Sequence, residues 1–138
     1  MSLDLDNLRN AVASLDRSLR VAETMPDMPL ELRETVRAGV IQNFEVAYES
    51  SWKFIQRWLR ENTTPTDADS PRTRKDLFRL AARTGLLADP TPWFGFGEAR
   101  NMTSHTYDEV HAESCLSTAR VFLPYAQDLL RRLEERND

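Results

Sequence analysis

The chain has 138 residues, a common length for a single domain, of which 41% are hydrophobic and 29% are charged. These proportions are typical of soluble globular proteins and exclude a disordered or fibrous chain. The 18 Lys and Arg residues and 22 Asp and Glu residues give a net charge of −4, so any nucleic-acid site must be a local basic patch.

The number of cysteines favours a reducing compartment, and the hydropathy disfavours a membrane segment. The single cysteine, Cys115, excludes an internal disulfide and any site built on several thiolates. No stretch reaches the roughly 18 uninterrupted apolar residues that span a bilayer, and the first residues lack the layout of a signal peptide. We therefore expect a cytoplasmic protein with no membrane segment, formed by one domain over residues 1–138.

The first two predicted elements are amphipathic helices. Residues 3–23 carry leucine and valine at alternating steps of three and four, which predicts a helix with one buried stripe. Pro26 and Pro29 end this helix, because proline cannot donate a backbone hydrogen bond. Residues 30–61 then form one long helix, whose inward arc is Val36, Val40, Phe44, Ala47, Tyr48, Ser51, Ile55 and Trp58.

A loop and a third helix follow. Residues 62–70 are rich in turn-forming side chains and predict an exposed loop. Ser70 is expected to cap the third helix, with Pro71 at its first position and Gly85 at its end. The inward face carries Leu77, Leu80 and Ala81, and the outer face is predicted to carry a basic stripe of Arg72, Lys75, Arg79 and Arg83, with Arg74 nearby. Such a stripe suits RNA, an acidic partner protein or plain solvation.

Two more helices complete the predicted fold. A short helix spans residues 91–100, although Gly95 and Gly97 weaken it by roughly 1 kcal/mol each relative to alanine. The last helix spans about residues 107–136 and is expected to bend at Pro124. No segment shows the alternation of a β-strand. Short connections between long amphipathic helices therefore predict an all-α, antiparallel up-and-down bundle of four to five helices.

The densest polar run lies between the last two predicted helices, over residues 100–107. His105 can exchange a proton near neutral pH, and Arg100 can hold phosphate oxygens through paired N–H groups. Asn101 can orient either group, and Tyr107 can bond a phosphate or stack on a base. This set could support metal-independent cleavage of RNA, and a hydrogen-bonded group that merely ties helices together would use the same residues.

Two segments resemble a known family. Residues 39–53, Gly-Val-Ile-Gln-Asn-Phe-Glu-Val-Ala-Tyr-Glu-Ser-Ser-Trp-Lys, and residues 99–108, Ala-Arg-Asn-Met-Thr-Ser-His-Thr-Tyr-Asp, resemble the nucleotidyltransferase substrate-binding branch of the HEPN superfamily. The most specific feature is an Arg, four residues, a His, any residue and a Tyr, here Arg100, His105 and Tyr107. The resemblance covers nearly the whole chain, in order.

This resemblance implies a helical bundle that forms a homodimer and pairs with a separately encoded minimal nucleotidyltransferase. As in HEPN toxins of toxin–antitoxin pairs, Arg100, Asn101 and His105 would form a ribonuclease site at the dimer cleft, without metal or cofactor. The substrate would be tRNA or mRNA, and adenylylation of Tyr107 by the partner, acting as antitoxin, would silence the toxin. The alternative is a non-catalytic subunit that binds substrate for the partner, which would then be the catalytic subunit of a two-component transferase.

Several features favour a partner and a second copy. No Gly-rich phosphate loop and no Gly-Ser run followed by paired aspartates is present, so we expect that the chain is not the transferase itself. One Arg and one His are few groups for phosphodiester cleavage, and a two-fold axis through the motif would double them. The aromatic residues Trp93, Phe94 and Phe96 would then form an apolar contact between the copies, or else ordinary core.

Four other side chains suggest weaker sites. His111 and Cys115 are one turn apart and could share a metal, but Cys115 lies on the inward arc, which favours a buried thiol. Glu45 and Glu49 could anchor a cation or form an acid/base pair, or they could be solvated carboxylates or salt-bridge partners for Lys53.

Overall fold

The structure, a computed structural model, describes residues 3–105 and 107–137. All regular elements within these residues are helices, which confirms the predicted all-α class. In chain order they are α1 (Asp6–Ala22), η1 (Met25–Asp27), α2 (Leu30–Asn62), α3 (Pro65–Ala68), α4 (Arg74–Arg83), α5 (Thr91–Asn101), η2 (Met102–His105) and α6 (Glu109–Glu135).

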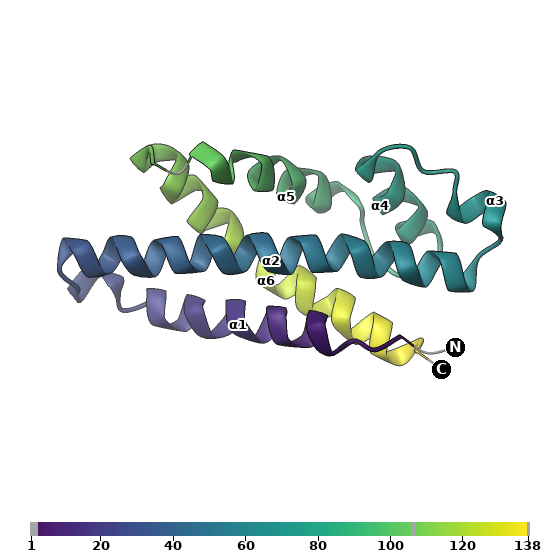
Figure 1. Cartoon of the computed structure of the whole chain (residues 1–138), viewed down its shortest axis with the longest axis horizontal. Helices are drawn as coiled ribbons and strands as arrows, with labels where there is room; N and C mark the ends of the chain where they lie inside the picture. Colours follow the sequence, from purple (N-terminus) through teal and green to yellow (C-terminus); the bar gives the residue numbers. More distant parts are fainter. Residues whose placement is uncertain (1–2, 106, 138) are drawn as a thin grey trace.

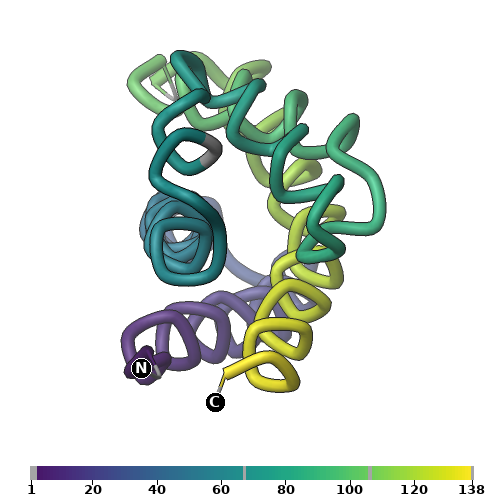
Figure 2. The backbone as a smooth tube through the Cα atoms, turned by 90° about the vertical axis from the view of Figure 1, so that its right-hand side faces the viewer, coloured from purple at the N-terminus to yellow at the C-terminus, as the bar shows by residue number. Residues whose placement is uncertain are grey.

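The long helix α2 is the axis of the molecule. Helix α1 runs antiparallel to α2 along one side, and α4 and α5 lie along the opposite side (Figure 1). Helix α6 crosses α2 and packs against α1, α2 and α5, and the end-on view shows the helices arranged around a common centre (Figure 2). Most of the buried hydrophobic side chains form one cluster between them. This arrangement confirms the predicted up-and-down bundle.

Aromatic rings from three helices fill the centre of the bundle. The ring of Phe122 on α6 meets Phe44 of α2 at 5.2 Å and Phe96 of α5 at 5.1 Å, edge to face in both cases. Trp93 packs against the same Phe122 ring at 5.6 Å. Trp93 and Phe96 are 1% and 4% exposed, so the core interpretation of the aromatic cluster is confirmed for these two residues.

The beginning of α4 differs from the prediction. The cap is Thr73, whose hydroxyl oxygen accepts a hydrogen bond from the backbone N–H of Asp76 at 3.1 Å. The predicted cap at Ser70 and the predicted first position at Pro71 are therefore wrong, because Thr73 satisfies the free N–H groups nearer to the apolar run. Arg72 consequently lies before α4 and not on its basic face.

The segments before and after α4 form turns. The segment predicted as an exposed loop over 62–70 contains the short helix α3, because Pro65 supplies a helical φ at its first position and Ala68 N–H donates to the Thr64 carbonyl at 2.8 Å. Gly85 ends the α4 region as predicted, with a φ of 85° that other residues rarely adopt. Its carbonyl accepts a hydrogen bond from Arg132 Nη1 at 2.9 Å, which ties this turn to α6.

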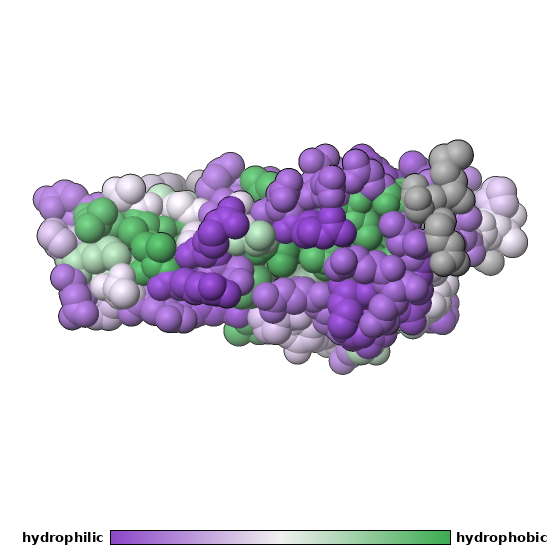
Figure 3. Space-filling view, turned by 90° about the horizontal axis from the view of Figure 1, so that it is seen from below, coloured by the Kyte–Doolittle hydropathy of each residue, from purple (hydrophilic) through white to green (hydrophobic). Residues whose placement is uncertain are grey.

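The two ends of the described part of the chain, at residues 3 and 137, are joined by hydrogen bonds. Leu3 N–H donates to Asn137 Oδ1 at 2.7 Å, and Asn137 Nδ2 donates to the Leu3 carbonyl at 2.8 Å. Hydrophilic side chains cover most of the face shown in Figure 3. Hydrophobic ones lie at the end where α1 gives way to α2 and again between the hydrophilic ones along the middle of this face. The exposed hydrophobic residues near the turn from α1 to α2 include Val21, Leu30 and Leu32.

Across the residues that the structure describes, no helix combines the length and the apolar character needed to cross a lipid bilayer.

Candidate functional site

The predicted motif lies at the break between α5 and α6. Arg100 and Asn101 form the last turn of α5, and His105 ends the tighter turn η2. Asp108 then caps α6, since its carboxylate accepts a hydrogen bond from the Val110 N–H at 2.8 Å. The motif is therefore spread around a corner of the backbone, and its residues do not share one helical face.

Arg100 is held by contacts within the protomer. Its Nε donates to Glu49 Oε1 at 3.1 Å, and its Nη1 lies 3.9 Å from Glu45 Oε2. Its Nη1 also donates to the Thr103 hydroxyl at 3.1 Å, and that hydroxyl donates to the Arg100 carbonyl at 2.7 Å. The side chain remains 31% exposed, and Nη2 donates to no described residue. The guanidinium is thus held against α2 and η2 and stays partly exposed.

The sequence patterns did not predict that Glu49 holds Arg100 in place. Pairing with Lys53 was one of the alternatives for Glu45 and Glu49, but the structure pairs both carboxylates with Arg100 on α5. Trp52 Nε1 donates to the second oxygen of Glu49 at 2.9 Å, so this carboxylate is fixed from two sides. Helical spacing reveals neighbours on α2 but gives no signal for a contact with a helix 51 residues away.

His105 is exposed and lies beside a second imidazole. Its ring centroid is 6.1 Å from that of His111 on α6, and His111 Nδ1 lies 3.6 Å from Asp108 Oδ2. Among the residues that the structure describes, no hydrogen bond or ion pair joins His105 to Arg100. A single protomer therefore does not bring the predicted base into contact with the predicted phosphate ligand.

Tyr107 is almost fully exposed, at 89%, and lies on the other side of the corner. It lines a pocket of about 260 Å³ together with Arg37 of α2 and Glu109 of α6. Arg37 donates to both oxygens of Glu109, at 2.8 and 3.0 Å, and to Glu113 at 2.6 Å. These bonds raise the pKa of Arg37 and lower that of Glu109. The phenol is thus open to solvent beside a charged clamp between α2 and α6.

Asn101 lies in a third environment. It is exposed and lines a pocket of about 330 Å³ between α2, α4 and α5, together with Tyr48, Arg74 and Lys75. Burial raises the pKa of the Tyr48 hydroxyl, so this group stays protonated at neutral pH. Asn101 therefore connects the motif to a basic pocket that contains neither Arg100 nor His105.

The basic stripe is only partly a single helical face. Lys75, Arg79 and Arg83 are exposed on α4, whereas Arg72 precedes the helix. Arg79 pairs with Asp76 at 2.9 Å, and both Lys75 and Arg79 lie over the ring of Phe94, at 5.5 and 5.1 Å from its centre. Lys75 and Arg79, two of the four cations of the stripe, therefore pack on an aromatic side chain of α5.

The candidate metal pair is a buried thiol and a half-buried imidazole. Cys115 is 2% exposed, and burial raises the pKa of its thiol. In the described part of the chain, no three His, Cys, Asp or Glu side chains gather as ligands of one metal ion. The buried-thiol interpretation of Cys115 is confirmed.

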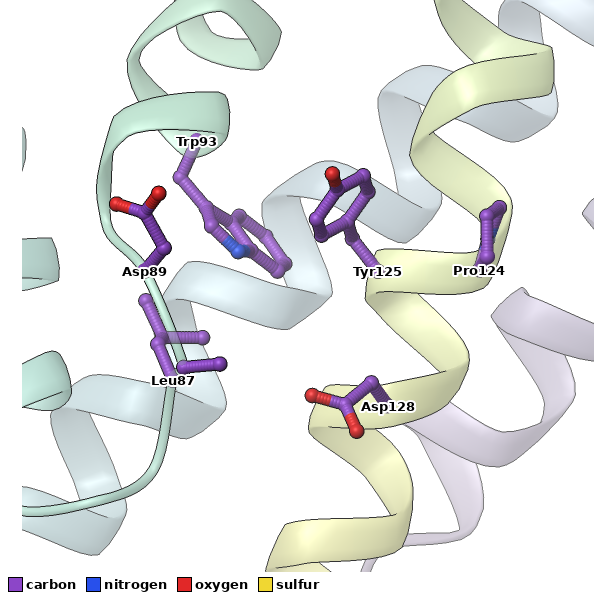
Figure 4. A pocket seen from close by; sticks show the side chains of 7 residues that line it. Leu87, Asp89, Trp93, Pro124, Tyr125 and Asp128 are labelled. Carbon is purple, nitrogen blue, oxygen red and sulfur yellow. The ribbon is translucent and has the colours of Figure 1, made fainter.

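A separate apolar pocket of about 320 Å³ contains none of the predicted site residues. Trp93 and Tyr125 face each other across it, and Asp89 and Asp128 flank them (Figure 4). Asp128 pairs with Arg132 at 2.9 Å, and Asp89 accepts a hydrogen bond from the Thr91 N–H at 3.0 Å. Both carboxylates already serve the local structure.

Comparison with known proteins identifies the relatives of this chain. A Haemophilus influenzae protein named probable ribonuclease HepT is 38% identical over 109 residues, which cover 79% of this chain and 75% of that protein. A solved structure from Haemophilus influenzae, described as the fold of a substrate binding domain of a nucleotidyltransferase, has a TM-score of 0.89 and 33% identity, and covers 95% of this chain and 99% of that chain. A crystal structure from Thermus thermophilus has a TM-score of 0.65 and 27% identity, over 86% and 98% of the two chains.

The match to a family model extends over almost the whole molecule, from α1 to the end of α6. This model covers residues 3–135, and the chain belongs to the family described as nucleotidyltransferase substrate binding protein like.

Proposed function

We propose that this protein is a metal-independent ribonuclease of HEPN type that works with a minimal nucleotidyltransferase. His105 takes the proton from a ribose 2′-hydroxyl, and the resulting oxygen attacks the adjacent phosphorus. Arg100 stabilises the charge that develops on the phosphate oxygens, and Asn101 positions the phosphate. The bond to the 5′-oxygen breaks, and the products are a 2′,3′-cyclic phosphate and a 5′-hydroxyl.

The observation that carries this proposal is the state of Arg100. Its guanidinium is fixed by Glu49 and Thr103, yet the side chain stays 31% exposed and Nη2 donates to no described residue. A cation that is positioned in advance loses little freedom when it binds a phosphate, which favours stabilisation of the transition state. The neighbouring His105 is exposed and is thus accessible to an RNA backbone.

The proposal includes a second copy of the chain. His105 and Arg100 have no contact within one protomer, and cleavage needs a base, an acid and a charge stabiliser. A two-fold axis beside the motif supplies two of each group, so that one His105 acts as base while the other protonates the leaving 5′-oxygen. A homodimer of this chain therefore contains the base, the acid and the charge stabiliser that cleavage needs.

The name of the Haemophilus relative and the family description support the chemistry and the partner. We assign the minimal nucleotidyltransferase the role of antitoxin: it transfers AMP from ATP to the Tyr107 hydroxyl and releases pyrophosphate. The exposure of Tyr107 supports this role, since an acceptor must enter the active site of another enzyme. The added phosphates lie beside the cleavage motif and exclude the RNA by charge repulsion.

A second candidate function is a non-catalytic subunit that presents substrate to the transferase. It is favoured by the two carboxylates beside Arg100, because Glu45 and Glu49 offset the positive charge that a phosphate requires. The description of the Haemophilus structure as a substrate binding domain also favours it.

Cleavage in excess EDTA separates the two functions. We expect the wild-type protein to cut tRNA or mRNA and leave a 2′,3′-cyclic phosphate, and His105→Ala and Arg100→Ala to be slower by roughly 10²- to 10⁴-fold. His111→Ala removes the neighbouring imidazole and serves as the matched control that retains cleavage. RNA left intact by the wild-type protein at high concentration would establish the binding subunit instead.

Intact-mass measurement tests the role of Tyr107. After treatment with the partner and ATP, we expect a gain of one or more AMP units on peptides that contain Tyr107. Tyr107→Phe should escape this modification and keep its ribonuclease activity in the presence of the partner. AMP found on other peptides of the wild-type protein would contradict the assignment.

A further inference from the structure

The pocket that contains Asn101 carries positive charge that the protein does not neutralise. Arg74 and Lys75 line it, and neither forms an ion pair with a described carboxylate. This contrasts with Arg37, Arg79 and Arg100, each of which pairs with at least one acidic side chain. Glu98 is the carboxylate among the lining residues, so two cations and one anion leave a net positive charge.

Aromatic rings hold these cations toward the pocket. The Arg74 guanidinium carbon lies 4.5 Å from the centre of the Trp52 ring and 5.6 Å from that of Tyr48. Lys75 Nζ lies 5.5 Å from the centre of the Phe94 ring. Cations stacked on rings keep most of their N–H groups available for an anion, because a ring face accepts no conventional hydrogen bond.

A buried hydroxyl adds a donor to the same pocket. Tyr48 is 0% exposed, and its oxygen accepts a long hydrogen bond from Arg74 Nη1 at 3.5 Å, while its own proton is donated to no described residue. Gly97 lines the pocket beside this hydroxyl and leaves space that a side chain would fill, since a Cβ at that position would lie 2.8 Å from the Tyr48 oxygen. A buried hydroxyl without an acceptor is costly, and a ligand oxygen in the pocket would satisfy it.

We propose that this pocket binds a phosphate group of RNA, adjacent to the strand position that the motif cleaves. The phosphate accepts hydrogen bonds from Arg74, Lys75 and the Tyr48 hydroxyl. Asn101, which lines the pocket, follows Arg100 directly in the last turn of α5, and this places the pocket next to the motif. The volume of about 330 Å³ lies at the lower end of the roughly 300–1,000 Å³ found for ligand pockets, which suits a single nucleotide unit.

This inference rests on the proposed function, and its test is a binding measurement independent of cleavage. A short labelled RNA with 2′-O-methyl groups cannot be cut through a 2′-hydroxyl, and its binding is followed by fluorescence anisotropy in EDTA. We expect Arg74→Gln and Lys75→Gln each to weaken binding by about five- to tenfold and to reduce the salt slope by about one. Arg17→Gln, on α1 across the bundle from α4, is the matched charge control and should change affinity less than about twofold (Figure 1).

Tyr48→Phe guards against a purely structural effect. It removes the hydroxyl and keeps the buried ring, so we expect weaker RNA binding with an unchanged circular dichroism spectrum. Wild-type affinity in both Arg74→Gln and Lys75→Gln overturns the inference, even if the wild-type protein cleaves RNA. A free nucleotide is the other source of a phosphate: if AMP binding depends on Arg74 and RNA binding does not, the RNA assignment is overturned.

Discussion

At the scale of single residues, the key contact is the one by which Glu49 positions Arg100. Its two carboxylate oxygens accept hydrogen bonds from Arg100 Nε at 3.1 Å and from Trp52 Nε1 at 2.9 Å. Glu45 approaches Arg100 only to 3.9 Å. The two carboxylates lie one helical turn apart on α2, so they form a natural pair for separating positioning from charge.

We expect Glu49→Gln to lower the kcat of RNA cleavage by about tenfold, because a displaced guanidinium no longer meets the transition state. Its effect on the free energy of unfolding should stay within about 1 kcal/mol, since the ion pair is partly exposed. Glu45→Gln removes the same charge and should change kcat less. Steady-state kinetics and urea unfolding measure both effects, and equal kcat values for the two variants would contradict the positioning role.

The two glycines of α5 make a second matched pair. A Cβ at Gly95 would meet nothing within 4 Å, so Gly95→Ala should stabilise the protein by about 0.5–1 kcal/mol through helix propensity. A Cβ at Gly97 would lie 2.8 Å from the buried Tyr48 hydroxyl, so Gly97→Ala should destabilise it by about 1–3 kcal/mol. Thermal unfolding of both variants checks the opposite signs; a stabilised Gly97→Ala would contradict the close packing of α5 on α2.

At the scale of elements, Arg37 clamps the beginning of α6 to α2. It bonds both oxygens of Glu109 and one of Glu113, and it lines the pocket beside Tyr107. The clamp therefore fixes the corner that presents the proposed modification site.

This clamp should make stability depend on pH. Arg37 lowers the pKa of Glu109 in the folded protein, so the stabilisation is complete above the ordinary value of 4.5 and is lost as the pH falls through the lowered value. We expect Glu109→Gln to have a lower melting temperature than the wild-type protein at neutral pH, and the difference to shrink below about pH 4. A difference that stays constant from neutral to acid pH would show that Glu109 acts through packing alone.

Sequence patterns were sufficient for most elements and failed where tertiary contacts decide. Helical periodicity predicted α1, α2 and α6 closely, because each buries one long apolar stripe. The beginning of α4 was misplaced because Ser70 and Thr73 both suit a cap, and only the contact with Asp76 selects Thr73. The motif at Arg100 and His105 was visible through its resemblance to a family, whereas its partner Glu49 lies 51 residues from Arg100 on another helix and leaves no mark on local spacing.

At the scale of the whole molecule, the bundle brings the motif to the surface where α5 meets α6 (Figure 1). One protomer holds Arg100 against α2 and His105 beside α6, without a contact between them. The proposed ribonuclease therefore depends on two copies, each contributing its Arg100 and His105 to one cleft.

Mixing two inactive variants tests this claim most directly. Arg100→Ala chains keep His105, and His105→Ala chains keep Arg100, so a mixed dimer still holds one group of each kind on opposite chains. We expect the mixture to cleave RNA in EDTA faster than either variant alone and more slowly than the wild-type protein, because one His105 meets one Arg100 and water must protonate the leaving 5′-oxygen in place of the second His105. If native mass spectrometry shows mixed dimers and the RNA stays intact, the two groups do not act across the interface and the account is wrong.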